Sequence, residues 1–165
     1  MMMISPKLTK AMNGQIGNEF GASLQYLSIA GYFQAQKLNL LSKLFFKQAD
    51  EEKEHALKFV HYVLDTQGKL EIPSVNAPKA TFSSAEEAVQ AALAWEKEVT
   101  EQIKKLMDIA VEENDYLAQN FLQWFIDEQL EEVNKMDQLL SVIQRAGEKN
   151  LLMVEAYLVH VEKAS

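Results

Sequence analysis

The chain has 165 residues, which suffice for one domain with one core and are too few for two domains of ordinary size. Its 24 acidic and 16 basic residues give a net charge of -8, which argues against nucleic-acid binding and suits attraction of cations. The lack of cysteine excludes disulfides and thiolate metal ligands, and no stretch has the apolar length of a signal peptide or membrane span. We therefore expect one domain over residues 1–165, located in the cytoplasm, with no nucleic-acid or membrane partner.

Helical periodicity predicts an all-α fold, because strand patterns are nearly absent and only 3 Pro and 6 Gly occur. The first helical segment ends near a turn at Lys37, and the seam along its apolar face also carries Glu19 and Tyr26, two turns apart. The second segment follows that turn, and its seam runs Leu38, Leu41, Phe45, Gln48, Glu52, His55, Phe59 and Tyr62. Charged residues therefore lie where the pattern calls for apolar ones.

A long non-helical connection, Thr66 to Phe82, separates the first two segments from the next two. When extended, it can span a helix of about 28 residues, roughly 42 Å, so we expect the second and third helices to run parallel. The third helix is predicted to begin at a cap on Ser83 or Ser84, with Glu86 or Glu87 closing a capping box.

The third and fourth helical segments also carry polar or charged residues at positions where the seam calls for apolar ones. Glu96 is the only charge on the third seam, and the fourth seam, after a turn near Asn114, carries Gln129 and Glu132. Gly147 ends the fourth helix, so the bundle covers about residues 6–146. A short fifth helix over about residues 149–163 is too apolar to stand free and is predicted to pack against other chains.

The polar seam residues fall at matching heights when they are counted from the two turns. Glu19 lies 18 residues before Lys37, and Glu52 and His55 lie 15 and 18 after it. Counted from Asn114 in the same way, Glu96 lies 18 before, Gln129 15 after and Glu132 18 after. At about 1.5 Å per residue each trio occupies about one turn of height. Two adjacent metal sites sharing a bridging carboxylate would explain this arrangement.

A buried carboxylate without a partner costs on the order of several kcal/mol, so it persists in a bundle only if it is paired or coordinated. A lone Glu-x-x-His on a helix is usually a solvated face, and the four matched heights are what favour metal here. Hard oxygen ligands with one imidazole suit iron in both oxidation states. By contrast, Glu51, Glu128 and Glu131 lie in acid-rich stretches and could simply be solvated.

The chain resembles the non-haem bacterial ferritins over essentially its full length. The matching stretches are Asn18-Glu19-Phe20 with Tyr26, Asp50-Glu51-Glu52-Lys53-Glu54-His55, Trp95-Glu96, Asn120-Phe121-Leu122-Gln123-Trp124 and Glu128-Gln129-Leu130-Glu131-Glu132. The resemblance implies a ferritin-like four-helix bundle with one long crossover and a short fifth helix. Lys53 stands where bacterioferritins carry their haem-ligating Met, so no haem is expected.

The resemblance also implies a ferroxidase centre. Glu19, Glu52 and His55 would hold one iron, and Glu52, Glu96 and Glu132 the second. Glu51, Glu128, Glu131 and Glu132 would form a third iron site, and Gln129 would hydrogen-bond an oxygen species or water. Tyr26 and Trp124 would donate electrons, although a seam Tyr is often plain core and packing explains Trp124 better than electron donation does.

Three functions remain open at this level. The first is an iron-storage ferroxidase that oxidises Fe(II) with dioxygen or hydrogen peroxide and keeps a ferric mineral inside a cage of twenty-four chains. The second is a di-iron oxidase or peroxide scavenger that stores nothing. The third is a helical scaffold without enzymatic activity, whose acidic residues would bind iron only weakly.

Overall fold

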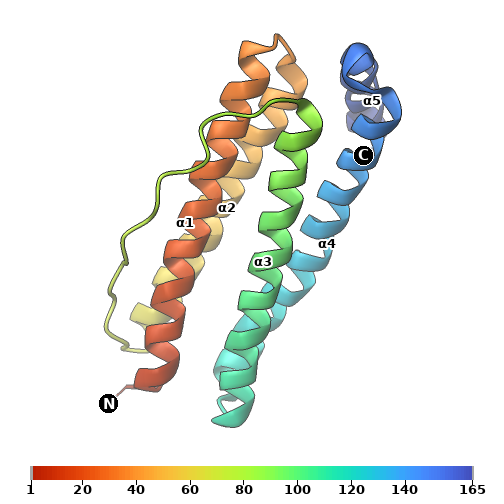
Figure 1. Ribbon diagram of the computed structural model, residues 1–165. Helices are drawn as coiled ribbons and strands as arrows, with labels where there is room; N and C mark the ends of the chain where they lie inside the picture. The colour runs from red at the N-terminus through yellow and green to blue at the C-terminus, as the bar shows by residue number, and fades with distance from the viewer. Residues whose placement is uncertain (1, 165) are drawn as a thin grey trace.

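The structure is a computed structural model that describes residues 2–164. Its helices are α1 Pro6–Ala35, α2 Asn39–Asp65, α3 Ala85–Glu112, α4 Tyr116–Ala146 and, after a short 3-10 turn at Glu148–Asn150, α5 Leu151–Ala164 (Figure 1). No strand occurs among these residues. The prediction of four long helices and a short fifth one is confirmed. Within residues 2–164 none of the helices combines the length and apolarity that a membrane crossing needs.

The helix ends follow local capping chemistry. Ser5 and Ser84 cap α1 and α3 by accepting a backbone N–H three residues on, each at 3.0 Å, and Pro6 occupies the first turn of α1. Lys37 and Asn114, the predicted turn centres, adopt left-handed φ values of 62° and 54°. These two residues therefore mark the points from which the heights of the seam residues are measured.

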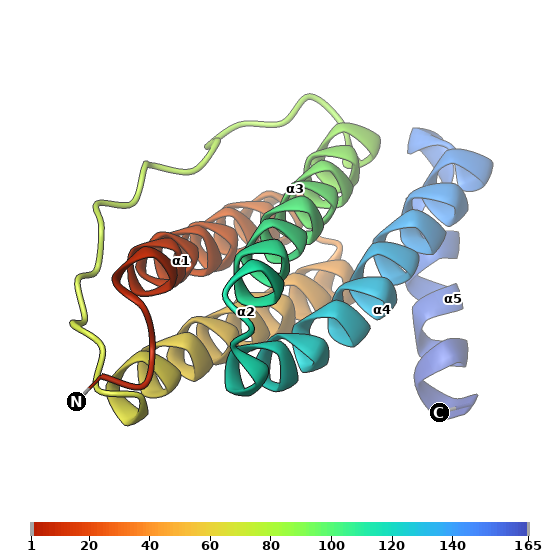
Figure 2. The same cartoon turned by 90° about the horizontal axis from the view of Figure 1, so that it is seen from below.

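The four long helices run up, down, down and up, so that α2 and α3 are parallel as predicted (Figure 1). The connection between them travels the length of the bundle along the outside of α1 (Figures 1 and 2). It lies so close to α1 that a Cβ added at Gly17 would be 2.5 Å from Cγ of Pro73. Gln25 of α1 exchanges two hydrogen bonds with the backbone of Lys79, at 2.9 and 3.2 Å. The return segment is thus seated on α1 where Gly17 leaves room for Pro73, and the side chain of Gln25 holds it there.

Two hydrophobic clusters fill the bundle, one toward each end. One is built around Tyr26, Phe33 and Phe45, and the other around Phe59 and Phe125. On every long helix the residues of one cluster stop before a short polar interval and those of the other cluster begin after it. The buried polar residues in these four intervals are Glu19, Glu52, His55, Glu96, Gln129 and Glu132. A polar layer therefore crosses the middle of the bundle.

The fifth helix lies apart from the parallel run of the long helices, beside the end of α4 (Figure 2). Val154 is its buried residue, and the carboxylate of Glu155 accepts the N–H of Leu40 at 2.9 Å. In contrast, Leu152 and Met153 are 75% and 67% exposed. One side of α5 is docked, and the other presents large apolar side chains.

Candidate di-metal site

The polar layer contains two overlapping groups of potential metal ligands. Glu19, Glu52 and His55 form one group and Glu52, Glu96 and Glu132 the other, and within each group the ligand atoms lie within 4.8 Å of one another. All five side chains are buried. Glu52 belongs to both groups, so one carboxylate would serve both sets of ligands. Nδ1 of His55 lies 3.3 Å from Oε2 of Glu52 and 4.0 Å from Oε2 of Glu19.

Burial raises the pKa of each carboxyl in the layer. It raises the pKa of Glu19 and Glu52 well above their ordinary value of 4.5, and the charges of neighbouring carboxylates raise them further. It also raises the pKa of Glu96 to about 7, although hydrogen bonds from Tyr26 and Gln129 lower it. For Glu132 burial raises the pKa, while the charge of Lys135 lowers it. Without a cation, the carboxyl groups of this layer therefore keep their protons to a higher pH than exposed carboxyl groups do.

Several oxygen atoms in the layer have no hydrogen-bond partner. Oε2 of Glu19, Oε1 of Glu52 and Oε1 of Gln129 are buried and unpaired. Buried oxygens are normally satisfied, and each unsatisfied one costs about 1–3 kcal/mol. The Gln129 oxygen can only accept, and the two carboxyl oxygens become acceptors once their groups lose their protons, so a cation or its bound water would satisfy all three. The donor set of carboxylates and one imidazole suits a hard or borderline divalent metal such as iron.

Gln129 and Tyr26 both hold Glu96. Nε2 of Gln129 donates to Oε2 of Glu96 at 3.0 Å and to Oγ1 of Thr100 at 3.3 Å. The hydroxyl of Tyr26, itself fully buried, donates to Oε1 of Glu96. Burial raises the pKa of Tyr26 well above 10, so its phenol stays protonated and able to donate. Both residues lie where the seam pattern predicted them, next to the candidate ligands.

An outer set of side chains, to which the sequence pattern assigned no role, orients the candidate ligands. Gln15 donates to Oε1 of Glu19 at 3.0 Å, one turn before it on α1. Gln48 donates to Oε2 of Glu132 at 2.7 Å, and the ammonium of Lys135 donates to Oε1 of Gln48. Gln48 lies on the predicted seam, so its burial could be anticipated. The i,i+4 spacing of Gln15 and Glu19 was an available signal for the first pair.

Trp124 packs against the imidazole of the layer. Its ring meets that of His55 edge-on with centroids 5.4 Å apart, and Nζ of Lys58 lies 4.1 Å from its centroid. The indole is 40% exposed. It therefore lies between the buried histidine and the surface and packs against both His55 and Lys58.

The residues predicted to form a third iron site do not lie as close together as the members of the two ligand groups. Oε1 of Glu128 lies 3.8 Å from Nε2 of His55, and Oε2 of Glu51 lies 3.8 Å from Nζ of Lys135. The side chain of Glu131 is exposed. Within residues 2–164, only the two groups described above gather three or more ligands.

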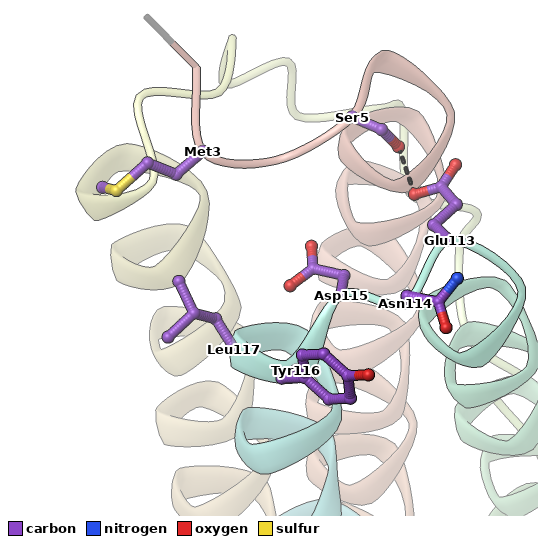
Figure 3. A pocket seen from close by; sticks show the side chains of 7 residues that line it. All are labelled: Met3, Ser5, Glu113, Asn114, Asp115, Tyr116 and Leu117. Carbon is purple, nitrogen blue, oxygen red and sulfur yellow. Dashed lines mark hydrogen bonds between the residues drawn. The ribbon is translucent and has the colours of Figure 1, made fainter.

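A surface pocket of about 590 Å³ lies at the opposite end of the bundle from α5 and shares no residue with the layer (Figure 3). Oγ of Ser5 donates to Oε2 of Glu113 at 2.6 Å across it, and Asp115 caps α4 through the N–H of Ala118. Both acidic groups are therefore engaged in holding the helix ends.

Comparisons with known proteins identify the family of the chain. Residues 9–146 match the Ferritin-like domain model named Ferritin. Ferritin BfrB of Mycobacterium tuberculosis is 41% identical over 152 residues, which cover 92% of this chain and 83% of that protein. The Bacterial non-heme ferritin of Staphylococcus aureus is 34% identical over 146 residues, with 88% of each chain covered.

A solved structure shares the fold. The open pore ferritin from the archaeon Archaeoglobus fulgidus superposes with a TM-score of 0.90 at 32% identity, covering 94% of this chain and 97% of that one. The family match spans most of the chain, and the similar relatives are covered over most of their length. The chain therefore belongs to the ferritin family, and the buried carboxylates and imidazole of its central layer are its candidate iron-binding groups.

Proposed function

We propose that this protein oxidises Fe(II) at the two overlapping ligand groups and stores the product as a ferric mineral inside a cage of twenty-four chains, in the cytoplasm. The observation that carries the proposal is Glu52, a buried carboxylate shared by both groups with one oxygen unpaired. A shared carboxylate keeps two ions close enough to lose one electron each to a single oxidant. That is the elementary requirement of a two-electron ferroxidase.

Iron enters this scheme as the substrate. Glu19, Glu52 and His55 bind the first Fe(II), and Glu52, Glu96 and Glu132 bind the second. Because burial raises the pKa of these carboxyls, binding replaces protons by metal, and uptake strengthens as the pH rises. Gln15 and Gln48 keep Glu19 and Glu132 turned toward the ions through the bonds described above.

The redox step balances with either oxidant. Two ferrous ions give up one electron each, and dioxygen takes both with two protons and leaves as hydrogen peroxide. Hydrogen peroxide, used instead, takes two electrons and two protons and leaves as two waters. The unpaired Oε1 of Gln129 accepts a hydrogen bond from water or from the protonated oxidant. When only one Fe(II) is bound, Tyr26 supplies the second electron to the oxidant and is left as a tyrosyl radical, its phenolic proton passing to Glu96.

The ferric ions then hydrolyse, release protons and move to the mineral. Glu51, Glu128, Glu131 and Glu132 are the carboxylates we propose for a third iron on that route, and Trp124 is a second electron donor. The exposed apolar face of α5 supports assembly, since large apolar side chains such as Leu152 mark protein contacts. Contacts between fifth helices of neighbouring chains would close the cage.

The test is the iron retained per chain after aerobic loading with Fe(II), measured on the particle isolated by size-exclusion chromatography. We expect retention far above the two or three ions of the binding positions, on a cage-sized particle. Glu52→Ala removes the shared ligand and should abolish rapid oxidation. Glu98→Gln, a change on the exposed side of α3, is the matched control and should behave as the unmodified protein.

Three results can be told apart. Retention of two or three ions at most would refute storage and leave a di-iron oxidase or peroxide scavenger. A protein that retains no iron, and for which Glu52→Ala changes nothing, would be a helical scaffold. Rapid oxidation that persists in Glu52→Ala would show that the oxidising site lies elsewhere.

A further inference from the structure

Lys135 reaches the polar layer from its rim on α4, one turn beyond Glu132. Its side chain is 40% exposed, and its ammonium donates to Oε1 of Gln48. Gln48 is fully buried and passes its own hydrogen bond to Oε2 of Glu132 at 2.7 Å. A continuous path therefore runs from a solvated cation to a candidate iron ligand.

The direction of this path is dictated by the donors. A lysine ammonium can only donate, so it requires the oxygen of the Gln48 amide to face it. The NH₂ group of the same amide is then turned toward Glu132. Without the ammonium, the amide could present either end to the carboxylate. Lys135 thus fixes the orientation of Gln48 and, through it, the position of Glu132.

The same ammonium also neutralises Glu51. Oε2 of Glu51 lies 3.8 Å from Nζ of Lys135, and Oε1 lies 3.8 Å from Nζ of Lys47. Each oxygen of this carboxylate therefore faces a positive charge. A divalent ion approaching Glu51 would meet two like charges at short range in a partly desolvated setting.

We propose that Lys135 is a positioning residue that limits iron binding beside the central pair, because its ammonium holds Glu51 and Gln48 in the unloaded protein and competes with a third ion. The inference rests on the proposed function, since it presupposes that Glu52 and its neighbours bind two ions. It explains why the oxygens of Glu51 face two lysines and why Glu51 belongs to neither of the two ligand groups. It also assigns the third ion a weaker affinity than the two central ones.

The test is an anaerobic calorimetric titration of the assembled protein with Fe(II). The unmodified protein should bind two ions tightly and a third weakly. Lys135→Met keeps the length of the side chain and removes the charge, and the dissociation constant of the third ion should fall by about tenfold or more. Lys135→Arg keeps a donating cation and should restore the unmodified pattern. Lys105→Met removes one exposed charge on α3 and should change nothing.

The outcomes separate this inference from the function on which it rests. Two tight ions with an unchanged third dissociation constant in Lys135→Met would refute the role of Lys135 and leave the di-iron centre intact. Equal tightening in Lys105→Met would refute it too, because net charge alone would then explain the effect. Absence of the two tight ions in the unmodified protein would overturn both the proposed function and this inference.

Discussion

Replacing Glu96 by Gln should stabilise the metal-free protein at neutral and alkaline pH. The folded state raises the pKa of Glu96 from 4.5 to about 7, and each pKa unit corresponds to about 1.4 kcal/mol. Ionising this residue inside the bundle therefore costs about 3 kcal/mol once the pH exceeds the folded pKa. Glutamine has nearly the same shape and carries no charge, so it avoids most of that cost.

The sign of the pH dependence follows from the two states. As the pH rises through about 4.5 the unfolded chain loses the Glu96 proton, while the folded chain keeps it until about 7. The contribution of this group to the free energy of unfolding therefore falls across that interval and then levels off. Glu96→Gln lacks this dependence, so its advantage grows from near zero at pH 4.5 to about 2–3 kcal/mol at pH 8. This advantage is smaller than the full cost of ionising Glu96, because the variant also loses the charge-assisted hydrogen bond that Glu96 accepts from Gln129.

The assay is thermal unfolding in the presence of a chelator, at fixed protein concentration and several pH values. For a chain of this size the gain corresponds to roughly 5–10 °C in Tm at pH 8. Glu98→Gln, the exposed neighbour on α3, should stay within about 0.5 kcal/mol of the unmodified protein at every pH. Equal melting of Glu96→Gln and the unmodified protein at pH 8, or a gain that is the same at pH 5, would refute the reasoning. In a separate series without chelator, added Fe(II) should raise Tm more in the unmodified protein, because the variant lacks one ligand.

Four other substitutions test three separate features. Gly17→Ala places a methyl group 2.5 Å from the ring of Pro73 and should destabilise the protein by about 1–3 kcal/mol in chemical denaturation, whereas Gly31→Ala, with nothing within 4 Å, should stabilise it through helix propensity. Tyr26→Phe removes the hydrogen bond that lowers the pKa of Glu96, so anaerobic Fe(II) affinity should fall more at pH 6.5 than at pH 8; an unchanged affinity at both would mean that the phenol acts only in oxidation. Leu152→Asp should leave the helical circular dichroism intact and shift the particle to smaller size on chromatography, and an unchanged size would show that this side chain lies outside the contacts of the cage.

The sequence carried enough information for the bundle and for the inner ligands because both depend on periodicity and length. Counting from Lys37 and Asn114 gave matching heights, and these two residues are the left-handed turn positions of the structure. A rigid helix transmits that count over some eighteen residues with little error. The burial of Glu52 and His55 follows from the same seam.

The outer residues were harder to foresee because their roles depend on tertiary geometry. Lys135 reads as a surface lysine on α4, and only the folded structure brings it to Gln48 of α2. The connection could be assigned a direction from its length, but its seat on Gly17 depends on which face of α1 it follows. Glu131 and Glu132 are adjacent glutamates of the same acidic stretch. They differ in the structure because the side chain of Glu131 is exposed and that of Glu132 is buried.

The polar layer divides the apolar core of the bundle into two halves, and each long helix contributes at least one side chain to it. Ions held there would fasten α1 and α2 to α3 and α4 as a noncovalent staple, joining residues as distant in sequence as Glu19 and Glu132. Closing so long a loop restricts the unfolded chain most, in the same sense as a crosslink. Ferrous ions bound in the layer would then also stabilise the bundle. Backbone amides beside the layer should therefore exchange their hydrogens more slowly as these ions bind.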